Sequence, residues 1–314
     1  MAAVPVVQLR GRVADALLAK RAGARALRSE LALELTGDCD VYKPDGKLLC
    51  ALRRAAIPAE LCDRAYPTLQ LARKHDSDNR AAYAGLPQLQ RVKVDGTLSR
   101  QRYTVGEDGR NIRLPTAVAG YFDRQGGRFR YCRTTAFTAD NVAAWNDLLP
   151  MVRHVAGLMR RDMPAPAARQ QAYVDGCSQD YVIQGTPFTT LTININVLGT
   201  IHKDAGDYRH GIGVISVVRR GTYQGGLLCF PGFKVGADLH NGDVIFFDPH
   251  EWHAVTAFEG ESSPDAERIS VVYYARERMH QCGSHEQELE RARALAEGRT
   301  LGGAAEEADE EAFA

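Results

Sequence analysis

Short apolar runs bounded by glycines and polar turns fill the second half of the chain, a pattern typical of β-strands. Six such runs follow residue 180, and no helical pattern lies between them. Short strands joined by brief turns predict an antiparallel sandwich or jelly roll. The six runs are FTTLTININV (188–197), GIGVISVVRR (211–220), GGLLCF (225–230), DVIFFD (243–248), HAVTAF (253–258) and RISVVYYAR (268–276).

Helical patterns mark the first half and the end of the chain. Apolar residues recur at helical spacing over 11–35 and again over 137–161, where Thr138 or Asp140 can cap the helix. The sequence MPAP (163–166) is expected to end the second helix. Residues 284–298 predict an exposed helix, and the acidic, low-complexity stretch 304–314 predicts a disordered tail.

Together these patterns predict an α+β fold, with a double-stranded β-helix (jelly-roll) core and flanking helices. We expect a mixed helical and β wrapper over 1–115, with turns at KPDG (43–46), VDG (94–96) and GEDG (106–109). The core is expected over 116–280, and the exposed helix and tail over 281–314.

Composition excludes several classes of protein. The chain has 314 residues, of which 45% are hydrophobic, and no apolar run approaches the ~18 residues of a membrane span. The N-terminus does not have the pattern of a secretory signal. Seven cysteines without a CxxC pair predict reduced thiols in an intracellular protein, nuclear in a eukaryote and cytoplasmic in a virus or bacterium. Neither a membrane nor a protein partner is implied.

The net charge of zero hides an uneven distribution. Residues 286–314 carry nine acids and three arginines, a balance of −6, so the remainder carries +6. Residues 91–133 hold ten basic side chains and four acids, with five Tyr and Phe residues between them. Such a stretch suits a polyanion whose phosphates are neutralised and whose bases stack. A solvated, arginine-rich surface explains this stretch equally well.

A histidine and an acid two residues apart follow the first strand, in TIHKDAGDYRH (200–210). In extended chain, His202 and Asp204 share a face and can chelate one metal ion. Over an unbroken strand Asn194 and Asn196 would share that face, but Gly199 is expected to interrupt the regularity.

A third ligand comes from GDVIFFDPHEWHAV (242–255), in which His253 lies 51 residues after His202. Two histidines and a carboxylate form the facial triad of non-haem Fe(II) oxygenases, which leaves positions open for co-substrate and oxygen. Taken singly, each histidine is more often a packed or surface residue, and Asp204 and Asp207 can be simple turn formers. The combined spacing within glycine-bounded strands favours an iron site made of His202, Asp204 and His253.

Arg268 follows His253 by fifteen residues, in the last predicted strand. Its guanidinium can form a bidentate pair with the far carboxylate of an iron-chelating 2-oxo-dicarboxylate, and Ser270, on the same face, can add a hydroxyl. An ordinary ion pair is the alternative role for Arg268.

These stretches resemble the TET and J-binding-protein class of Fe(II)/2-oxoglutarate dioxygenases. The resemblance rests on TIHKDAGDY (200–208), residues 225–255 and RISVVYYAR, and more loosely on GYFD (120–123) and CRTTAFTADN (132–141). It covers roughly 115–278 well and 1–114 poorly. Members hydroxylate the 5-methyl group of pyrimidines in nucleic acid. The resemblance implies the ligand roles given above and puts Gly225 and Gly226 where backbones approach closely.

The resemblance also implies the cofactors and the substrate. Fe(II), 2-oxoglutarate and O2 are expected, with ascorbate as a reductant or co-substrate. Asp207 matches an acidic position beside the co-substrate and the target base. We expect DNA carrying a flipped 5-methylpyrimidine as substrate, with 5-methylcytosine ahead of thymine because the Asp207 carboxylate can accept from the cytosine amino group. A protein or small-molecule hydroxylase of the same superfamily, or a jelly-roll binding module without turnover, are the alternatives.

Overall fold

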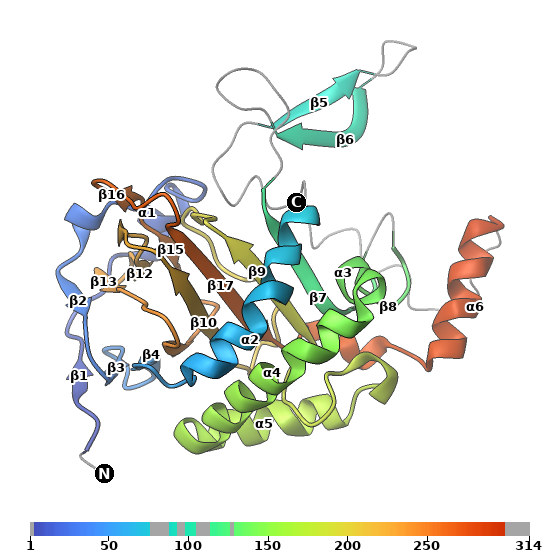
Figure 1. The fold of residues 1–314 in the computed structure, drawn as a ribbon, viewed down its shortest axis with the longest axis horizontal. Helices are drawn as coiled ribbons and strands as arrows, with labels where there is room; N and C mark the ends of the chain where they lie inside the picture. Colours follow the sequence, from blue (N-terminus) through green and yellow to red (C-terminus); the bar gives the residue numbers. More distant parts are fainter. Residues whose placement is uncertain (1–2, 76–87, 93–97, 105–113, 126–128, 299–314) are drawn as a thin grey trace.

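Helices, a large sheet and a small sheet form three layers (Figure 1). The computed structural model describes residues 3–75, 88–92, 98–104, 114–125 and 129–298. The predicted α+β class and jelly-roll core are confirmed, because short antiparallel strands from the second half of the chain form the centre of both sheets.

Nine strands make the large sheet, in the order β1-β3-β4-β14-β10-β17-β9-β7-β8. All pairs are antiparallel except β1 with β3. Its strands are β1 (Val6–Gln8), β3 (Cys39–Tyr42), β4 (Leu48–Arg53), β7 (Thr116–Phe122), β8 (Arg133–Thr134), β9 (Thr190–Ile195), β10 (Gly213–Arg220), β14 (Val244–Phe247) and β17 (Glu267–Tyr274).

The small sheet has four strands in the order β15-β12-β13-β2, and β2 joins it parallel to β13. Two further pairs, β11 with β16 and β5 with β6, stand apart from the main sheets. The strands are β2 (Leu33–Leu35), β5 (Gln88–Val92), β6 (Leu98–Thr104), β11 (Gln224–Gly225), β12 (Leu228–Phe230), β13 (Val235–Ala237), β15 (Ala254–Val255) and β16 (Phe258–Glu259).

Two apolar clusters hold the layers together. One joins the sheets and includes Leu49, Ile215 and Phe247 of the large sheet and Phe230 and Val235 of the small one. The other packs helices on the opposite face of the large sheet. Since its central strands are covered on both faces, they read as continuous apolar runs, and β14 is wholly buried.

The helices covering the large sheet are α2 and α4, with α5 beyond them (Figure 1). The hydroxyl of Thr68 in α2 donates to the carbonyl of Ala144 in α4 at 3.1 Å. The helices are α1 (Asp15–Ala19), α2 (Ala59–Gln70), α3 (Ala136–Asp140), α4 (Val142–Asp162), α5 (Pro164–Asp175) and α6 (His285–Ala296), with short 3-10 turns at Arg28–Glu30, Leu71–Lys74, Gln179–Tyr181 and Glu277–Gln281.

The predicted helix over 11–35 is wrong apart from the single short helix α1. Tertiary backbone bonds replace helical ones: the N–H of Gly23 donates to Ile201, and the N–H of Ile201 donates to Ala24. Further on, β2 pairs with β13. This segment runs along the small sheet and is mostly not helical. Its helical spacing of apolar residues therefore did not predict its structure.

The predicted helix over 137–161 is confirmed, but it divides at Asn141 into α3 and α4. Thr135, rather than Thr138 or Asp140, caps α3 by accepting from the Thr138 N–H. Trp145 and Leu148 are buried, whereas Val142 is exposed. MPAP ends α4, and its first proline opens α5, which the sequence analysis did not predict.

The expectation that all seven thiols are reduced is wrong. Cys132 and Cys282 form a disulfide across 150 residues of chain, and the other five cysteines are free and buried. Sequence spacing could not reveal this pair because only the packing of the helix-bearing C-terminal segment against the segment before β8 brings the two together. The bond joins the start of the α6 region to the rest of the molecule.

The remaining sequence predictions concern the turns, the C-terminal helix and the domain boundary, and their outcomes differ. KPDG forms the turn between β3 and β4, and α6 is the expected C-terminal helix, although its Glu288 is buried. VDG, GEDG, the acidic tail and much of 91–133 lie outside the described residues. The division at residue 115 stays a prediction, but strands from both sides of it share each main sheet. In the described part of the chain, no helix has the length and apolarity of a membrane span.

Candidate metal centre

The loop after β9 carries two of the expected metal ligands. The strand ends at Ile195, and Asn196 takes a left-handed conformation with φ 54°, so the break precedes Gly199. His202 and Asp204 therefore lie in a loop rather than on the strand. Backbone bonds still fix this loop, because His202 and His253 exchange N–H···O bonds of 3.0 and 2.9 Å and the Asp204 N–H donates to Pro249 at 3.0 Å.

His202, Asp204 and His253 converge on one point. Their candidate ligand atoms all lie within 4.8 Å of one another. The Asp204 carboxylate is 3.6 Å from Nε2 of His202 and 3.3 Å from Nε2 of His253. Two imidazoles and one carboxylate at this separation can hold one metal ion and leave other coordination positions open.

Backbone carbonyls orient both imidazoles. Nδ1 of His202 lies 2.6 Å from the carbonyl of Thr200, and Nδ1 of His253 lies 2.9 Å from that of Glu251. A protonated Nδ1 donating to a carbonyl leaves Nε2 as the lone-pair atom, and in both residues Nε2 is the atom beside Asp204. The tautomer required of a metal ligand is therefore built into the two loops.

The Asp204 carboxylate favours positive charge in this cluster. Burial disfavours the charged imidazole of His253, but the nearby Asp204 carboxylate outweighs burial and raises the pKa of His253. His253 is only 4% exposed, so bulk water screens the interaction weakly. The same field favours a divalent cation at this point.

Arg268 lies on β17 with its side chain buried, only 2% exposed. Burial lowers the pKa of Arg268. Its Nε has no hydrogen-bond partner among the described residues. Ser270, two residues along the same strand, shares its face and is 6% exposed. A buried guanidinium with an unused donor is costly unless an anion meets it, so these residues fit a carboxylate ligand.

Tyr223 is a candidate ligand residue that the sequence analysis missed. It is 6% exposed, and its hydroxyl has no partner within the described part of the chain. Burial raises the pKa of Tyr223, whereas the positive charge of Arg268 opposes that rise, which places the two groups in electrostatic contact. No motif marks this tyrosine, because it lies in the turn before β11.

Glycines close this part of the site, as the resemblance implied. Gly225 and Gly226 both have positive φ, 75° and 66°. A Cβ at Gly225 would collide with the Ala257 carbonyl, and one at Gly226 would come within 3.4 Å of the Arg268 side chain. Only glycine allows β11 and β16 to approach this closely over Arg268.

Asp207 pairs through its backbone with Arg276, the last residue of RISVVYYAR. The Arg276 side chain donates from Nε to Asp123 at 2.7 Å and lies over the Phe122 ring at 4.3 Å. Asp207 adds to the negative charge around this guanidinium, which raises the pKa of Arg276 although burial opposes it. Arg276 and Asp123 were not predicted, because their contact joins residues 153 apart.

A cleft of about 350 Å³ is lined in part by Phe122, the ring that Arg276 covers. Aromatic rings and cations share its wall: the Arg133 guanidinium lies 3.9 Å from the Phe129 ring centroid and 5.1 Å from that of Phe122. Lys74 and His75 contribute further basic groups. Stacking surfaces with adjacent cations are what an unpaired base and its phosphate require.

Three other histidines have ordinary partners. His154 contacts the carbonyl of Ala56, and His240 and His250 pair with nearby aspartates. Among the described residues, the only group of three or more His, Cys, Asp or Glu side chains close enough to hold a metal ion is His202, Asp204 and His253.

Comparison with known families finds a match over residues 117–277 to the Tet_JBP model, described as the oxygenase domain of the 2OGFeDO superfamily. Similar curated proteins include thymine dioxygenase JBP1 of Trypanosoma brucei brucei, 32% identical over 163 residues, which are 51% of this chain and 19% of that protein. Thymine dioxygenase JBP1 of Leishmania infantum is 34% identical over 172 residues, 54% of this chain and 21% of that protein. This chain spans about a fifth of their length.

Among solved structures, NgTET1 in complex with 5mC DNA has a similar fold. The TM-score is 0.57 at 14% sequence identity, and the match covers 91% of this chain and 100% of that one. The likeness therefore extends beyond the family-model match, into the N-terminal strands that complete both sheets.

Proposed function

Because this chain belongs to the Tet_JBP family, the oxygenase domain of the 2OGFeDO superfamily, we propose that it oxidises the 5-methyl group of a pyrimidine in DNA, with 5-methylcytosine preferred to thymine. The observation that carries the proposal is the convergence of His202, Asp204 and His253 within the fold of this family. The relatives are named thymine dioxygenases, and the similar structure holds 5mC DNA.

The donor set fits Fe(II). Two neutral imidazoles and a carboxylate suit this metal, and the orientation of both rings by backbone carbonyls supports their role as ligands. In this proposal His202, Asp204 and His253 hold the iron.

The residues around Arg268 fit 2-oxoglutarate. Two buried donors without partners among the described residues, Nε of Arg268 and the Tyr223 hydroxyl, would both be satisfied by one carboxylate. Ser270 would add a third hydrogen bond. We assign these three residues to the carboxylate of 2-oxoglutarate that does not touch the metal.

Bound iron, 2-oxoglutarate and O2 together supply the oxidation: a methyl C–H bond becomes C–OH, and 2-oxoglutarate leaves as succinate and CO2. The protein's own residues hold the reactants in place and exclude water. Because His253, Arg268 and Tyr223 are buried, water is excluded from the part of the site that they form.

Asp207 supports the preference for cytosine. Its carboxylate can accept a hydrogen bond from the cytosine amino group, whereas thymine presents a carbonyl oxygen that a carboxylate repels. The Arg276 side chain, which pairs with Asp123, lies beside Gly206, the neighbour of Asp207 in the chain. A base inside a duplex cannot reach this point, so flipping is part of the proposal.

The cleft at Phe122, Phe129 and Arg133 supports DNA as the polymer. Its rings can stack on a displaced base, and Lys74 and Arg133 can neutralise phosphates. This is the feature that separates the proposal from its runner-up, a protein or small-molecule hydroxylase of the same superfamily, which has no need of a cationic aromatic cleft.

The test is direct oxidation of defined DNA. Enzyme, Fe(II), 2-oxoglutarate and ascorbate are incubated with methylated and unmethylated duplexes, which are then digested to nucleosides and measured by mass spectrometry. We expect 5-hydroxymethylcytosine from methylated DNA alone. Hydroxymethyluracil would move the preference to thymine.

Two further experiments test the role of ascorbate and the class of substrate. Omission of 2-oxoglutarate with ascorbate retained tests whether ascorbate is a reductant or replaces the oxoacid. If no nucleoside changes while a peptide or small molecule stimulates succinate release, the chain acts on that class of substrate and the DNA proposal is wrong.

A further inference from the structure

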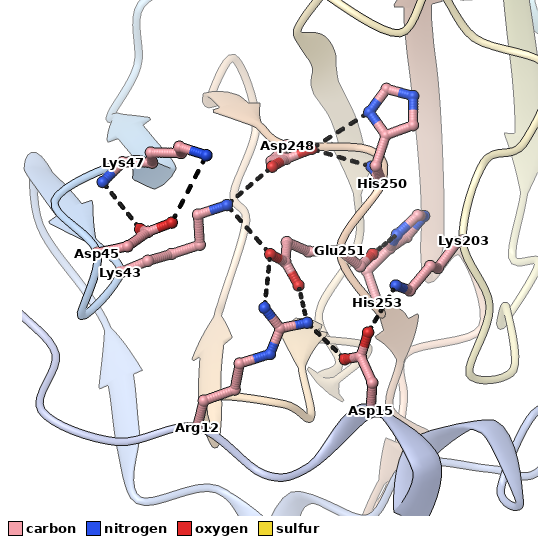
Figure 2. Close-up of polar contacts among 10 residues, drawn as sticks. All are labelled: Arg12, Asp15, Lys43, Asp45, Lys47, Lys203, Asp248, His250, Glu251 and His253. Atoms are coloured by element: carbon pink, nitrogen blue, oxygen red, sulfur yellow. Dashed lines mark hydrogen bonds and ion pairs between the residues drawn. The ribbon is translucent and has the colours of Figure 1, made fainter.

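Charged residues before position 44 contact both loops that carry the candidate metal ligands (Figure 2). Arg12 and Lys43 contact the loop that leads to His253, and Asp15 contacts the loop of His202 and Asp204. We call Arg12, Asp15 and Lys43 the N-terminal clamp. All three lie outside residues 117–277, which match the family model.

Lys43 is the buried centre of the clamp. It follows β3, is 6% exposed, and its Nζ lies 3.0 Å from Oδ2 of Asp248 and 3.1 Å from Oε1 of Glu251. Burial disfavours the charged amine, but the two carboxylates outweigh burial and raise the pKa of Lys43. The lysine therefore stays charged and binds both ends of the turn 248–251.

Glu251 connects this charge to the candidate metal ligand. Its side chain binds Lys43 and Arg12, while its backbone carbonyl lies 2.9 Å from Nδ1 of His253 (Figure 2). The carboxylate is buried, with only 9% of the side chain exposed. Because one residue makes both contacts, the position of its side chain also fixes the carbonyl that sets the direction of the His253 ring.

The clamp reaches the second loop through Asp15 and Lys203. Lys203 stands between His202 and Asp204 in sequence, and its Nζ lies 3.3 Å from Asp15 and 5.0 Å from the Trp252 ring centroid. Asp15 is 53% exposed, so this ion pair is screened and contributes little. The buried Lys43 contacts carry most of the effect.

We propose that Lys43, acting through Asp248 and Glu251, is a positioning residue that sets the His253 imidazole for metal binding. The proposal rests on the metal role of His202, Asp204 and His253 in the proposed function. Without Lys43, the buried Glu251 carboxylate and the partly exposed Asp248 carboxylate lose the cation that joins them, the turn 248–251 shifts, and the carbonyl that orients His253 moves with it.

The test compares cobalt binding by full-length variants, because Co(II) occupies sites of this kind and its ligand-field spectrum reports coordination geometry. Lys43→Met removes the charge and keeps most of the side-chain volume. We expect the Kd for Co(II) to rise about 10- to 100-fold, as for other groups that orient metal ligands, with a changed spectrum.

Lys47→Met is the matched control, since the Lys47 side chain is 77% exposed and its Nζ lies 3.8 Å from the exposed Asp45 carboxylate. It should bind Co(II) as the wild type does. His202→Ala should abolish binding. Should Lys43→Met fail to fold, Glu251→Gln provides the same test, because it keeps the carbonyl and the side-chain shape and loses the charge that binds Lys43.

A merely structural role predicts a different result. In that case Lys43→Met lowers the melting temperature equally with and without Co(II) and leaves the Kd and the spectrum unchanged, which would overturn the proposal. A wild-type chain that binds no cobalt would instead overturn the proposed metal site. Failure of DNA oxidation alone leaves the cobalt result, and hence the positioning role, intact.

Discussion

Backbone carbonyls two residues before each histidine decide which imidazole nitrogen is available in the candidate metal centre. The pattern is the same for His202 with Thr200 and for His253 with Glu251. The clustering of His202, Asp204 and His253 could be predicted from sequence, because two of them are near neighbours and the third follows a strand. The orienting carbonyls could not, because loop conformation determines them.

The two residues that hold the co-substrate in our proposal can be tested by one substitution each. Arg268→Lys should weaken 2-oxoglutarate binding far more than metal binding, because an ammonium cannot form the bidentate pair. Tyr223→Phe should weaken it about 10- to 100-fold, the range expected for one hydrogen bond to a charged group. Anaerobic calorimetry of the Fe(II)-loaded protein measures both constants.

The control ligand is 2-oxobutyrate, which chelates metal but has no far carboxylate, so neither substitution should change its affinity. Tyr181→Phe is the control variant, since Tyr181 is buried elsewhere and its hydroxyl lies near His285. Equal losses for both ligands would show that Arg268 and Tyr223 support the metal site and do not bind the carboxylate.

At the scale of elements, strands were more predictable than the segments that wrap them. The six apolar runs after residue 180 all contain strands, because burial between two layers leaves the sequence little choice. Residues 11–35 have helical spacing but follow the small sheet, since their partners lie near residues 201 and 235. Likewise, the Lys43–Glu251 contact spans 208 residues, and no local pattern predicts it.

Helix α6 is attached through a buried carboxylate, and this makes its stability depend on pH. Glu288 is 1% exposed and accepts from the N–H groups of Cys132 and Gly283 at 2.8 and 2.9 Å, and from Arg124. Burial opposes ionisation, but these donors outweigh it and lower the pKa of Glu288. A lowered folded pKa stabilises the protein above the ordinary glutamate value of 4.5.

Glu288→Gln should therefore reduce the free energy of unfolding by about 1–3 kcal/mol at pH 7. The difference from wild type should shrink as the pH falls below 4.5, because the unfolded wild-type chain then gains a proton that the folded carboxylate, with its lower pKa, does not yet bind. Urea unfolding at several pH values measures it. Glu286→Gln, on the exposed side of the same helix, is the control. A difference that persists unchanged at pH 3 would contradict this account.

At the scale of the whole molecule, the motifs that carry the candidate metal ligands and the strands that complete their fold come from different parts of the chain. The family match begins at residue 117, yet β4 pairs with the edge of β14, and β2 pairs with β13. Leu49 and Leu52 of β4 are completely buried in the cluster between the sheets. Without the N-terminal strands, both sheets have open edges and the apolar cluster between the sheets is exposed.

A fragment of residues 114–298 should consequently fail to fold cooperatively, although it contains every candidate metal and co-substrate residue. Loss of β4 removes one of the two backbone partners of β14 and exposes apolar surface next to the strand that leads to His253. We expect weak near-ultraviolet circular dichroism and a broad urea transition, against a sharp one for a control fragment of residues 3–298. The opposite outcome is that the shorter fragment unfolds as sharply as the control and binds Co(II). In that case the boundary expected at residue 115 separates an independent domain, which folds without the N-terminal strands.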